Sequence, residues 1–335
     1  METNNSIIHV ILTGGVGSRL WPLSRKSQPK QYLEIFEGKS LFEMTVERNS
    51  HLADKVMVVG NVDNHHLSGK VMDKTKTSYL NIVEATPRNT AAAIAFAAFA
   101  SNEDDVLIIT PSDHIIDKMD DYNNAIQKAI SKAKDGYIVT FGIIPTKPET
   151  GYGYIESKGD KVISFREKPN ETTAKEFIAR GNFLWNSGMF CFKAGVLLDE
   201  LKQFQPDVYE KSKIVWETSQ NGFLDLSSSL EIPSISIDYA VMERSKKIKV
   251  VPASFSWSDL GSFESVYEYL VSNGHPTDSN GNMVIGCESH TTFLGLKNTI
   301  FVHTETANLI LQKENSQEVK DIYSELEKQN SELLN

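Results

Sequence analysis

Short apolar runs alternate with longer amphipathic segments along the first part of the chain. The runs are rich in isoleucine and valine, and the segments between them carry apolar residues at helical spacing. This alternation predicts a βαβ arrangement, in which parallel strands form a sheet with helices on both faces. The predicted strands lie at residues 7–12, 55–60, 79–83, 105–110 and 136–143.

The middle of the chain changes to strand-rich sequence and then to helices. Residues 152–192 predict a hairpin that turns at 158–160, followed by a strand that ends at a helix. Helices then dominate to about residue 270, interrupted by a strand at 246–253. The first four fifths of the chain, to about residue 270, therefore predict one large mixed α/β unit.

A change of composition at residues 272–282 predicts a linker or long turn. Several short strands follow it, and an amphipathic helix with Ser316 as its expected cap closes the chain. We therefore expect a large domain over 1–271 and a short β-rich region with a helix over 283–335. The predicted fold class is α/β, with a Rossmann-like, mostly parallel mixed sheet flanked by helices and a small C-terminal β-rich unit.

Composition and charge narrow the class of protein. Hydrophobic residues make up 40% of the chain and charged residues 23%, as in ordinary folded proteins. The formal net charge of -10 argues against nucleic acid or an anionic membrane surface as a partner. No secretory signal or membrane-length apolar run is evident, so we expect a cytoplasmic protein without a membrane partner.

One basic, glycine-rich loop at residues 12–31 stands out in this acidic chain. Glycines that follow a first strand let backbone N–H groups approach phosphate oxygens. The loop lacks the Gly-Lys-Ser/Thr of a Walker A motif and the third glycine of the dinucleotide motif, and a tight turn with solvated charges is the alternative. Four cations and no acidic residue lie between Glu2 and Glu34: Arg19, Arg25, Lys26 and Lys30.

Two aspartates are candidate metal ligands. Mg²⁺ usually takes one or two carboxylates together with water and substrate phosphate. Asp113 follows an apolar strand at its carboxyl end, where ligands of open α/β sheets bind, and Asp259 lies in the sequence WSDLG. Either aspartate also suits a helix cap, so the pattern alone leaves both roles open.

Eight ordered blocks resemble the sugar-nucleotide pyrophosphorylases. The first is GGVGSRLWPLSR followed by PKQ, whose WPLSR and PKQ version is similar to that of the GDP-mannose pyrophosphorylases. The resemblance covers residues 7–270 and continues through EATPRNTAAAI, TPSDHII, TGYGYIE, FREKP, WNSGMF, SIDYAVMER and FSWSDLGSF. It implies the nucleotide-diphospho-sugar transferase fold and transfer of GMP from GTP to α-D-mannose 1-phosphate with Mg²⁺.

The resemblance also implies roles for individual residues. Arg19, Lys30 and Lys168 are the expected catalytic residues, and Asp113 and Asp259 the expected ligands of Mg²⁺. The expected sugar-binding residues are Gly153, Glu167, Lys168, Asn186 and Asp238. The expected nucleotide-binding residues are Leu12, Gly14, Gly15, Gly17, Ser18, Arg19, Arg88, Asn89, Thr90, Ser112 and Asp113.

Simpler roles remain open for several of these residues. Asn89 or Thr90 is a good cap for the alanine-rich helix that the sequence predicts after Asn89. Asn186 suits a turn. Because Lys168 precedes a proline, we expect it in extended geometry with Glu167 facing the opposite way. Joint binding of a sugar phosphate by these two residues would then require a local bend. Asp238 is expected at a helix start, where the dipole favours a carboxylate.

Two other functions stay open at this point. A related nucleotidyltransferase acting on another sugar 1-phosphate, such as a heptose phosphate, would share these blocks. A non-catalytic nucleotide-sugar sensor of the same fold would not need the full set of charged residues. The region after residue 282 is a candidate for a homodimer contact.

Overall fold

The computed structural model describes residues 5–34 and 38–335, which form two compact units. The first, here called the sheet unit, comprises the described residues 5–14 together with 45–112 and 116–257. The second, here called the loop unit, comprises residues 15–44, 113–115 and 258–335, without the undescribed 35–37. The units are therefore discontinuous in sequence, whereas the boundary expected at 272–282 follows chain order and stays a prediction.

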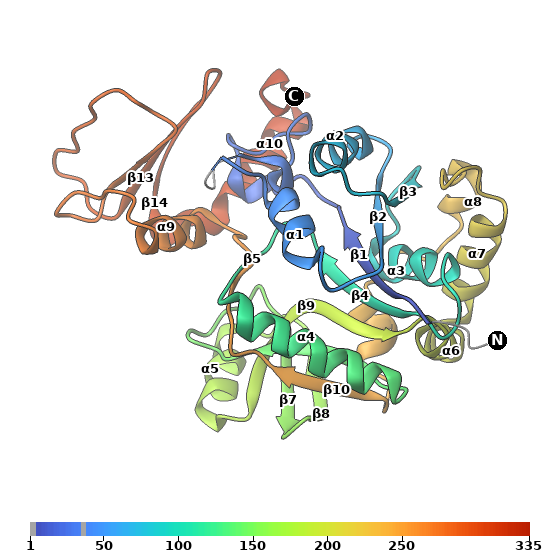
Figure 1. Cartoon of the computed structure of the whole chain (residues 1–335). Helices are drawn as coiled ribbons and strands as arrows, with labels where there is room; N and C mark the ends of the chain where they lie inside the picture. The colour runs from blue at the N-terminus through green and yellow to red at the C-terminus, as the bar shows by residue number, and fades with distance from the viewer. Residues whose placement is uncertain (1–4, 35–37) are drawn as a thin grey trace. The chain divides into compact units, whose positions relative to one another are not determined.

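The sheet unit is built on one mixed sheet with the strand order β3-β2-β1-β4-β9-β6-β10-β8-β7 (Figure 1). Strands β3, β2, β1 and β4 run parallel, and β10 runs parallel to β6. β9 is antiparallel to both β4 and β6 and joins the two parallel groups. The strands are β1 (Ile7–Leu12), β2 (Lys55–Asn61), β3 (Leu80–Glu84), β4 (Val106–Pro111), β6 (Ile138–Ile143), β7 (Tyr154–Lys158), β8 (Lys161–Arg166), β9 (Phe183–Lys193) and β10 (Ile248–Pro252).

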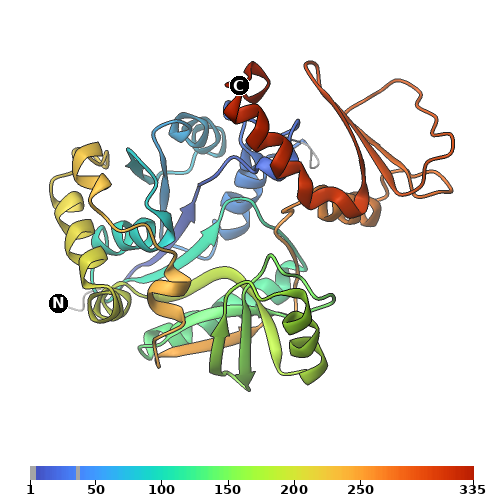
Figure 2. The ribbon, with the colours of Figure 1, turned by 180° about the vertical axis from the view of Figure 1, so that it is seen from behind.

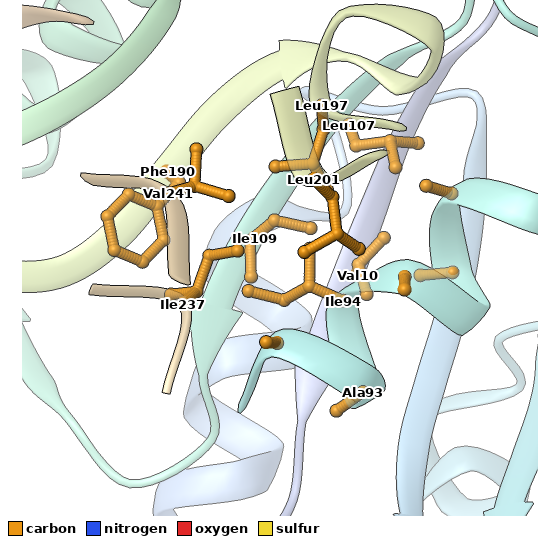
Figure 3. Packing of buried hydrophobic residues seen from close by; sticks show 14 of the residues in the cluster. Val10, Ala93, Ile94, Leu107, Ile109, Phe190, Leu197, Leu201, Ile237 and Val241 are labelled. Atoms are coloured by element: carbon orange, nitrogen blue, oxygen red, sulfur yellow. The ribbon is translucent and has the colours of Figure 1, made fainter. Parts of the chain in front are cut away.

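Both faces of this sheet are covered by helices, which confirms the predicted fold class. Because successive side chains of a strand point to opposite faces, Leu107 and Ile109 of β4 enter one core and Val106 and Ile108 the other. Figure 3 shows the first core, where Ile94 packs with residues of the sheet and of α6. The helices of the sheet unit are α2 (His65–Thr75), α3 (Asn89–Phe99), α4 (Met119–Lys134), α5 (Glu171–Arg180), α6 (Ala194–Phe204), α7 (Pro206–Glu217) and α8 (Leu226–Leu230), with a π-helical turn at Asp238–Met242.

The local predictions agree well with the observed elements. The hairpin of β7 and β8 turns at the predicted position, where Gly159 adopts a φ of +63°. Helix α1 (Leu41–Asn49) follows Ser40, whose hydroxyl accepts a hydrogen bond from the Glu43 N–H. The alanine-rich α3 buries every residue from Ala91 to Ala98, which explains its uniformly apolar composition.

The loop unit has a separate core that joins the glycine-rich loop to the C-terminal segment. Leu20 and Trp21 of the loop pack in one buried cluster with Phe263, Ile300 and Tyr323. Figures 1 and 2 show the C-terminal helix α10 beside this N-terminal segment. The elements are the 3-10 turns η1 (Ser18–Leu20) and η2 (Lys30–Tyr32), α9 (Phe263–Ser272), the sheet of β12 (Met283–Ile285), β13 (Thr299–His303) and β14 (Asn308–Gln312), η4 (Lys313–Glu318), α10 (Val319–Lys328) and η5 (Glu332–Leu334). The strands β5 (Ile115–Asp117) and β11 (Ser256–Ser258) lie where the chain passes between units.

The expected cap of the last helix is wrong. Ser316 lies inside η4, where its hydroxyl donates to the carbonyl of Lys313, and Glu318 is the N-cap of α10. A serine hydroxyl can bond backwards to a carbonyl as readily as it can cap, and here the 3-10 turn takes it.

Among the helices of the described residues, none combines the length and apolar character needed to cross a membrane.

Candidate active site

The glycine-rich loop is folded back onto Lys30 by short contacts within the loop unit. Gly17 has a φ of +79°, and a Cβ atom on it would lie 2.5 Å from Cβ of Lys30. The Lys30 N–H donates to the carbonyl of Val16 at 3.0 Å, and the Ser24 hydroxyl donates to that of Gly17 at 2.6 Å. Glycine is therefore required at position 17 both by conformation and by space.

Lys30 is a buried cation held between the carboxylate of Asp113 and the backbone carbonyl of Asp259. Its side chain is only 6% exposed, and Nζ donates to Asp113 Oδ2 at 2.8 Å and to the backbone carbonyl of Asp259. Burial alone would raise the pKa of Asp113, but the Lys30 ammonium and His114 bring that pKa below its ordinary value. Asp113 is therefore an ionised carboxylate at neutral pH, and its geometry relative to Lys30 is fixed.

These groups line one hollow of about 450 Å³ within the loop unit. Six of the residues that the sequence assigned to the nucleotide or the metal lie together there, and Lys30 lies with them. Arg19 contributes a buried Nε that has no hydrogen-bond partner among the described residues. Backbone N–H groups, an unpartnered guanidinium nitrogen and a lysine suit an oligophosphate. The lining residues are Gly15, Val16, Gly17, Ser18, Arg19, Leu20, Lys26, Lys30, Asp113, Asp259, Gly261, Tyr323 and Glu327.

The two other cations of the loop are engaged by the C-terminal segment of the loop unit. Arg25 donates to the carbonyl of Pro22 and, at 3.0 Å, to the hydroxyl of Thr304. Lys26 forms an ion pair with Glu327 of α10 at 3.1 Å. The charge of the loop therefore serves partly to attach the C-terminal segment, which the sequence did not indicate.

The carboxylates of Asp113 and Asp259 fit a magnesium ion as a donor set. Both line the hollow, and both belong to residues that contact Lys30 Nζ. No group of three or more His, Cys, Asp or Glu in the described residues is arranged to hold a metal. Two hard oxygen donors are nevertheless the usual protein share of a Mg²⁺ site that substrate phosphates complete.

The remaining nucleotide candidates belong to the sheet unit. Leu12 ends β1, Gly14 follows it, and the Ser112 N–H donates to the Leu12 carbonyl at 3.1 Å. These residues thus lie at the carboxyl ends of adjacent parallel strands, where ligands of open α/β sheets commonly bind.

The segment at the start of α3 has structural contacts that the sequence did not reveal. Arg88, and not Asn89 or Thr90, is the N-cap residue, and its Nε donates to the carbonyl of Ile232 at 2.6 Å. The Thr90 hydroxyl accepts from the Ile237 N–H at 2.9 Å. Two of the three residues therefore anchor the segment that leads to Asp238.

Glu84 is a further candidate that the sequence reasoning did not single out. It ends β3 within the block EATPRNT, is buried, and has an Oε1 atom without a partner among the described residues. Burial raises its pKa to about 7, although the N–H of Arg88 acts in the opposite direction. An acidic side chain three residues before Pro87, at the start of the motif that contains Arg88, is the signal that could have found it.

The expected sugar-binding residues converge within the sheet unit. A Cβ atom on Gly153 would lie 2.6 Å from Oε2 of Glu167 and 3.4 Å from Cβ of Asn186. The Asn186 N–H also donates to the carbonyl of Gly153 at 2.8 Å. Residue 153 is therefore a glycine because the two polar side chains meet over its backbone.

The predicted geometry of Glu167 and Lys168 is wrong. β8 ends at Arg166, Lys168 has a φ of +44°, and its Nζ lies 3.2 Å from Glu167 Oε1. The chain turns before Pro169 instead of continuing as a strand, so the two side chains share one side. This is the local bend that joint binding of a sugar phosphate requires.

Asn186 and Asp238 are linked by hydrogen bonds. Asn186 Nδ2 donates to Asp238 Oδ1 at 3.0 Å, while its Oδ1 accepts from Thr140 at 3.1 Å and from the Gly188 N–H at 3.2 Å. Asn186 lies within β9 and not in a turn, at an irregularity of the pairing with β6. Burial, and then the nearby Glu167, raise the pKa of Asp238 to about 7.

Asp238→Asn is expected to flatten the pH dependence of the free energy of unfolding between about pH 4 and pH 7. A raised pKa means that the folded state binds the proton more tightly than the unfolded chain does. The wild-type protein therefore loses stability as the pH rises from 3.8 towards about 7. Urea unfolding at a series of pH values measures this change, with the surface variant Asp104→Asn as control. Parallel curves for Asp238→Asn and the wild type would contradict it.

A family model described as nucleotidyl transferase matches residues 8–273. The chain belongs to the nucleotidyl transferase family.

Individual proteins of known name show which relatives the chain is similar to. The chain is 36% identical to a mannose-1-phosphate guanylyltransferase of Klebsiella pneumoniae, over 94% of this chain and 72% of that one. A Thermus thermophilus structure described as mannose-1-phosphate geranyltransferase is 28% identical, with a TM-score of 0.81 over 96% of this chain and 99% of that one. A Helicobacter pylori structure described as mannose-6-phosphate isomerase is 38% identical, with a TM-score of 0.70 over 76% of this chain and 99% of that one.

Proposed function

We propose that the protein transfers GMP from GTP to α-D-mannose 1-phosphate, forming GDP-mannose and pyrophosphate. The observation that carries this proposal is the hollow of the loop unit, with its backbone N–H groups, Arg19, Lys30 and the carboxylates of Asp113 and Asp259. Membership of the nucleotidyl transferase family and 36% identity to a mannose-1-phosphate guanylyltransferase support the choice of reaction and of substrates.

The chemistry of this transfer fits the side chains present. An anionic oxygen of the sugar phosphate attacks the α-phosphorus of GTP, the bond to the bridging oxygen breaks, and pyrophosphate leaves. Because the nucleophile is already ionised, no general base is needed, and alignment and charge neutralisation supply the catalysis. Neither a covalent enzyme intermediate nor a redox step is required.

Individual roles follow from the charge and position of each group. Arg19 and Lys30 bind the triphosphate and the leaving pyrophosphate, and Lys168 orients the sugar phosphate beside Glu167. Asp113 and Asp259 would hold Mg²⁺, which supplies charge neutralisation on the phosphates when bound. Glu167, Asn186 and Asp238 present acceptors and donors suited to sugar hydroxyls. Arg88, Asn89 and Thr90 bind the guanine nucleotide.

The homodimer and the cytoplasmic location stay predictions.

The proposal is tested by pyrophosphate release over four nucleoside triphosphates and a panel of hexose and heptose 1-phosphates with Mg²⁺. GTP with mannose 1-phosphate is expected to have the highest kcat/KM, because the WPLSR, PRNTA and IDYAVME blocks occur together in this chain. A higher value for a heptose phosphate would assign another sugar. Tight nucleotide-sugar binding without turnover would indicate a sensor, and isomerisation of mannose 6-phosphate in a parallel assay would indicate the activity named for the Helicobacter structure.

A further inference from the structure

Tyr323 of the C-terminal helix α10 lines the same hollow as the glycine-rich loop. The residue is only 6% exposed, and its hydroxyl is buried without a hydrogen-bond partner among the described residues. Buried hydroxyl groups in native proteins are rarely left unpaired, because desolvation without a new hydrogen bond is unfavourable. The hydroxyl therefore has an unused donor, on a residue that lines the hollow together with Arg19 and Lys30.

The surroundings of this hydroxyl are charged and belong to the same hollow. Burial raises the pKa of the Tyr323 phenol, Lys26 lowers it, and Glu327 raises it. Lys26 and Glu327 already form an ion pair at 3.1 Å, so neither needs the phenol as its main partner. The phenol stays protonated at neutral pH and can donate to an acceptor but cannot repel it.

We propose that the Tyr323 hydroxyl donates a hydrogen bond to the β- or γ-phosphate of the bound nucleoside triphosphate, which makes α10 part of the triphosphate site. The inference rests on the proposed function for the identity of the ligand. It names the pyrophosphate part of that ligand because the hollow combines Tyr323 with Arg19 and Lys30, whereas the candidates for guanine and sugar lie in the sheet unit.

A contact with the β- or γ-phosphate should affect the affinity for some ligands of this site and not for others. When the sugar phosphate attacks the α-phosphorus, GDP-mannose retains only the α-phosphate of GTP, and the β- and γ-phosphates leave as pyrophosphate. A group that binds these two phosphates therefore contributes to the affinity for GTP and for inorganic pyrophosphate. It contributes nothing to the affinity for GMP or for GDP-mannose.

The test is isothermal titration calorimetry of the full chain and of Tyr323→Phe with pyrophosphate, GTP, GMP and GDP-mannose in Mg²⁺. Loss of a hydrogen bond to a charged group is expected to raise the Kd of pyrophosphate and GTP about tenfold. The Kd of GMP and GDP-mannose should not change. The Tm should not fall, since the hydroxyl has no partner among the described residues.

A matched variant separates ligand binding from folding. The Tyr267 hydroxyl donates to the carbonyl of Gly281 at 3.1 Å in the same unit, and Tyr267 is not among the residues of the hollow. Tyr267→Phe should therefore lower the Tm and leave the pyrophosphate Kd unchanged, the reverse of Tyr323→Phe. Ser324→Ala, on the exposed face of α10, should change neither quantity.

Two results would overturn the role of Tyr323: an unchanged pyrophosphate Kd, or an equal rise in the Kd of all four ligands. Failure of the proposed function gives a different result, namely no pyrophosphate release by the wild-type protein from GTP and mannose 1-phosphate. Pyrophosphate titrated alone does not depend on the base or on the sugar, so the two failures are distinguishable.

Discussion

Lys30→Gln is expected to lower the kcat of GMP transfer by about 100- to 1,000-fold, which corresponds to about 2.7–4 kcal/mol for one preorganised donor of positive charge. The Lys30 side chain is 6% exposed, and its Nζ is held by Asp113 and the carbonyl of Asp259. A charge fixed in this way needs no reorganisation as negative charge develops on the leaving pyrophosphate. Glutamine keeps a hydrogen-bond donor, on a side chain one atom shorter, but removes that charge.

The effect should fall mainly on kcat, with a smaller rise in the KM for GTP. The charge on leaving pyrophosphate exceeds the charge on bound GTP, so the lost interaction is stronger in the transition state than in the ground state. Lys30→Arg should recover only part of the activity. A planar guanidinium cannot replace the ammonium between two fixed acceptors, and Gly17 packs directly on the lysine stem.

Steady-state kinetics at saturating Mg²⁺ and mannose 1-phosphate measure this change, and circular dichroism verifies that each variant is folded. Lys213→Gln is the matched control, because the Lys213 side chain is 44% exposed and pairs with Glu217 at 3.8 Å on α7. The control should retain wild-type turnover. A change of less than about threefold in Lys30→Gln would place Lys30 among ordinary structural cations, since the expected loss is about a hundredfold or more.

Asp113→Asn and Asp259→Asn are expected to have different effects, although each removes one candidate carboxylate ligand of Mg²⁺. Asp259 contacts Lys30 through its backbone carbonyl, whereas Asp113 contacts Lys30 through its side chain. Asparagine at 259 therefore keeps the lysine contact and can still accept the Gly261 N–H, which lies 3.0 Å from Oδ1. Asparagine at 113 loses both a metal ligand and the counterion of a buried lysine.

Titration of activity against Mg²⁺ distinguishes the two variants. Asp259→Asn should shift the midpoint to higher Mg²⁺ and recover most of its turnover at saturation. Asp113→Asn should shift the midpoint and also keep a kcat at least about tenfold low at saturating metal, because the lost charge–charge contact to Lys30 is not restored by Mg²⁺. Calorimetric titration of Mg²⁺ in the presence of pyrophosphate provides a readout that does not depend on turnover.

The exposed variant Asp225→Asn is a suitable control for this titration, because Asp225 caps α8 and its carboxylate binds serines of that helix. It should leave the Mg²⁺ midpoint unchanged. Superimposable Mg²⁺ curves for wild type, Asp113→Asn and Asp259→Asn would exclude these carboxylates as ligands and leave Asp113 as the partner of Lys30 only.

Local sequence patterns predicted those parts of the protein that depend on near neighbours in the chain. The period of the hydrophobic pattern and the turn chemistry predicted the strands around residues 7–12 and 105–110 and the hairpin at 158–160. These features follow from backbone preferences and from burial of one or two faces, which a short window of sequence already contains. The motif blocks predicted the class of enzyme in a similar way. Each block is a contiguous segment, so a short window of sequence contains it whole.

Tertiary structure alone decided which distant residues meet. Nothing near Lys30 in the sequence indicates that Asp113 and the carbonyl of Asp259 hold its ammonium, because such contacts depend on how the whole chain packs. The bend at Lys168 departs from the extended geometry expected before a proline and places its ammonium 3.2 Å from Glu167 Oε1, a contact that the one-residue preference does not contain. The helical pattern of residues 316–330 likewise predicts an amphipathic helix but not what its apolar face meets. The fold sets that face against the glycine-rich loop and places Tyr323 in the lining of the hollow that Lys30 and Asp113 also line.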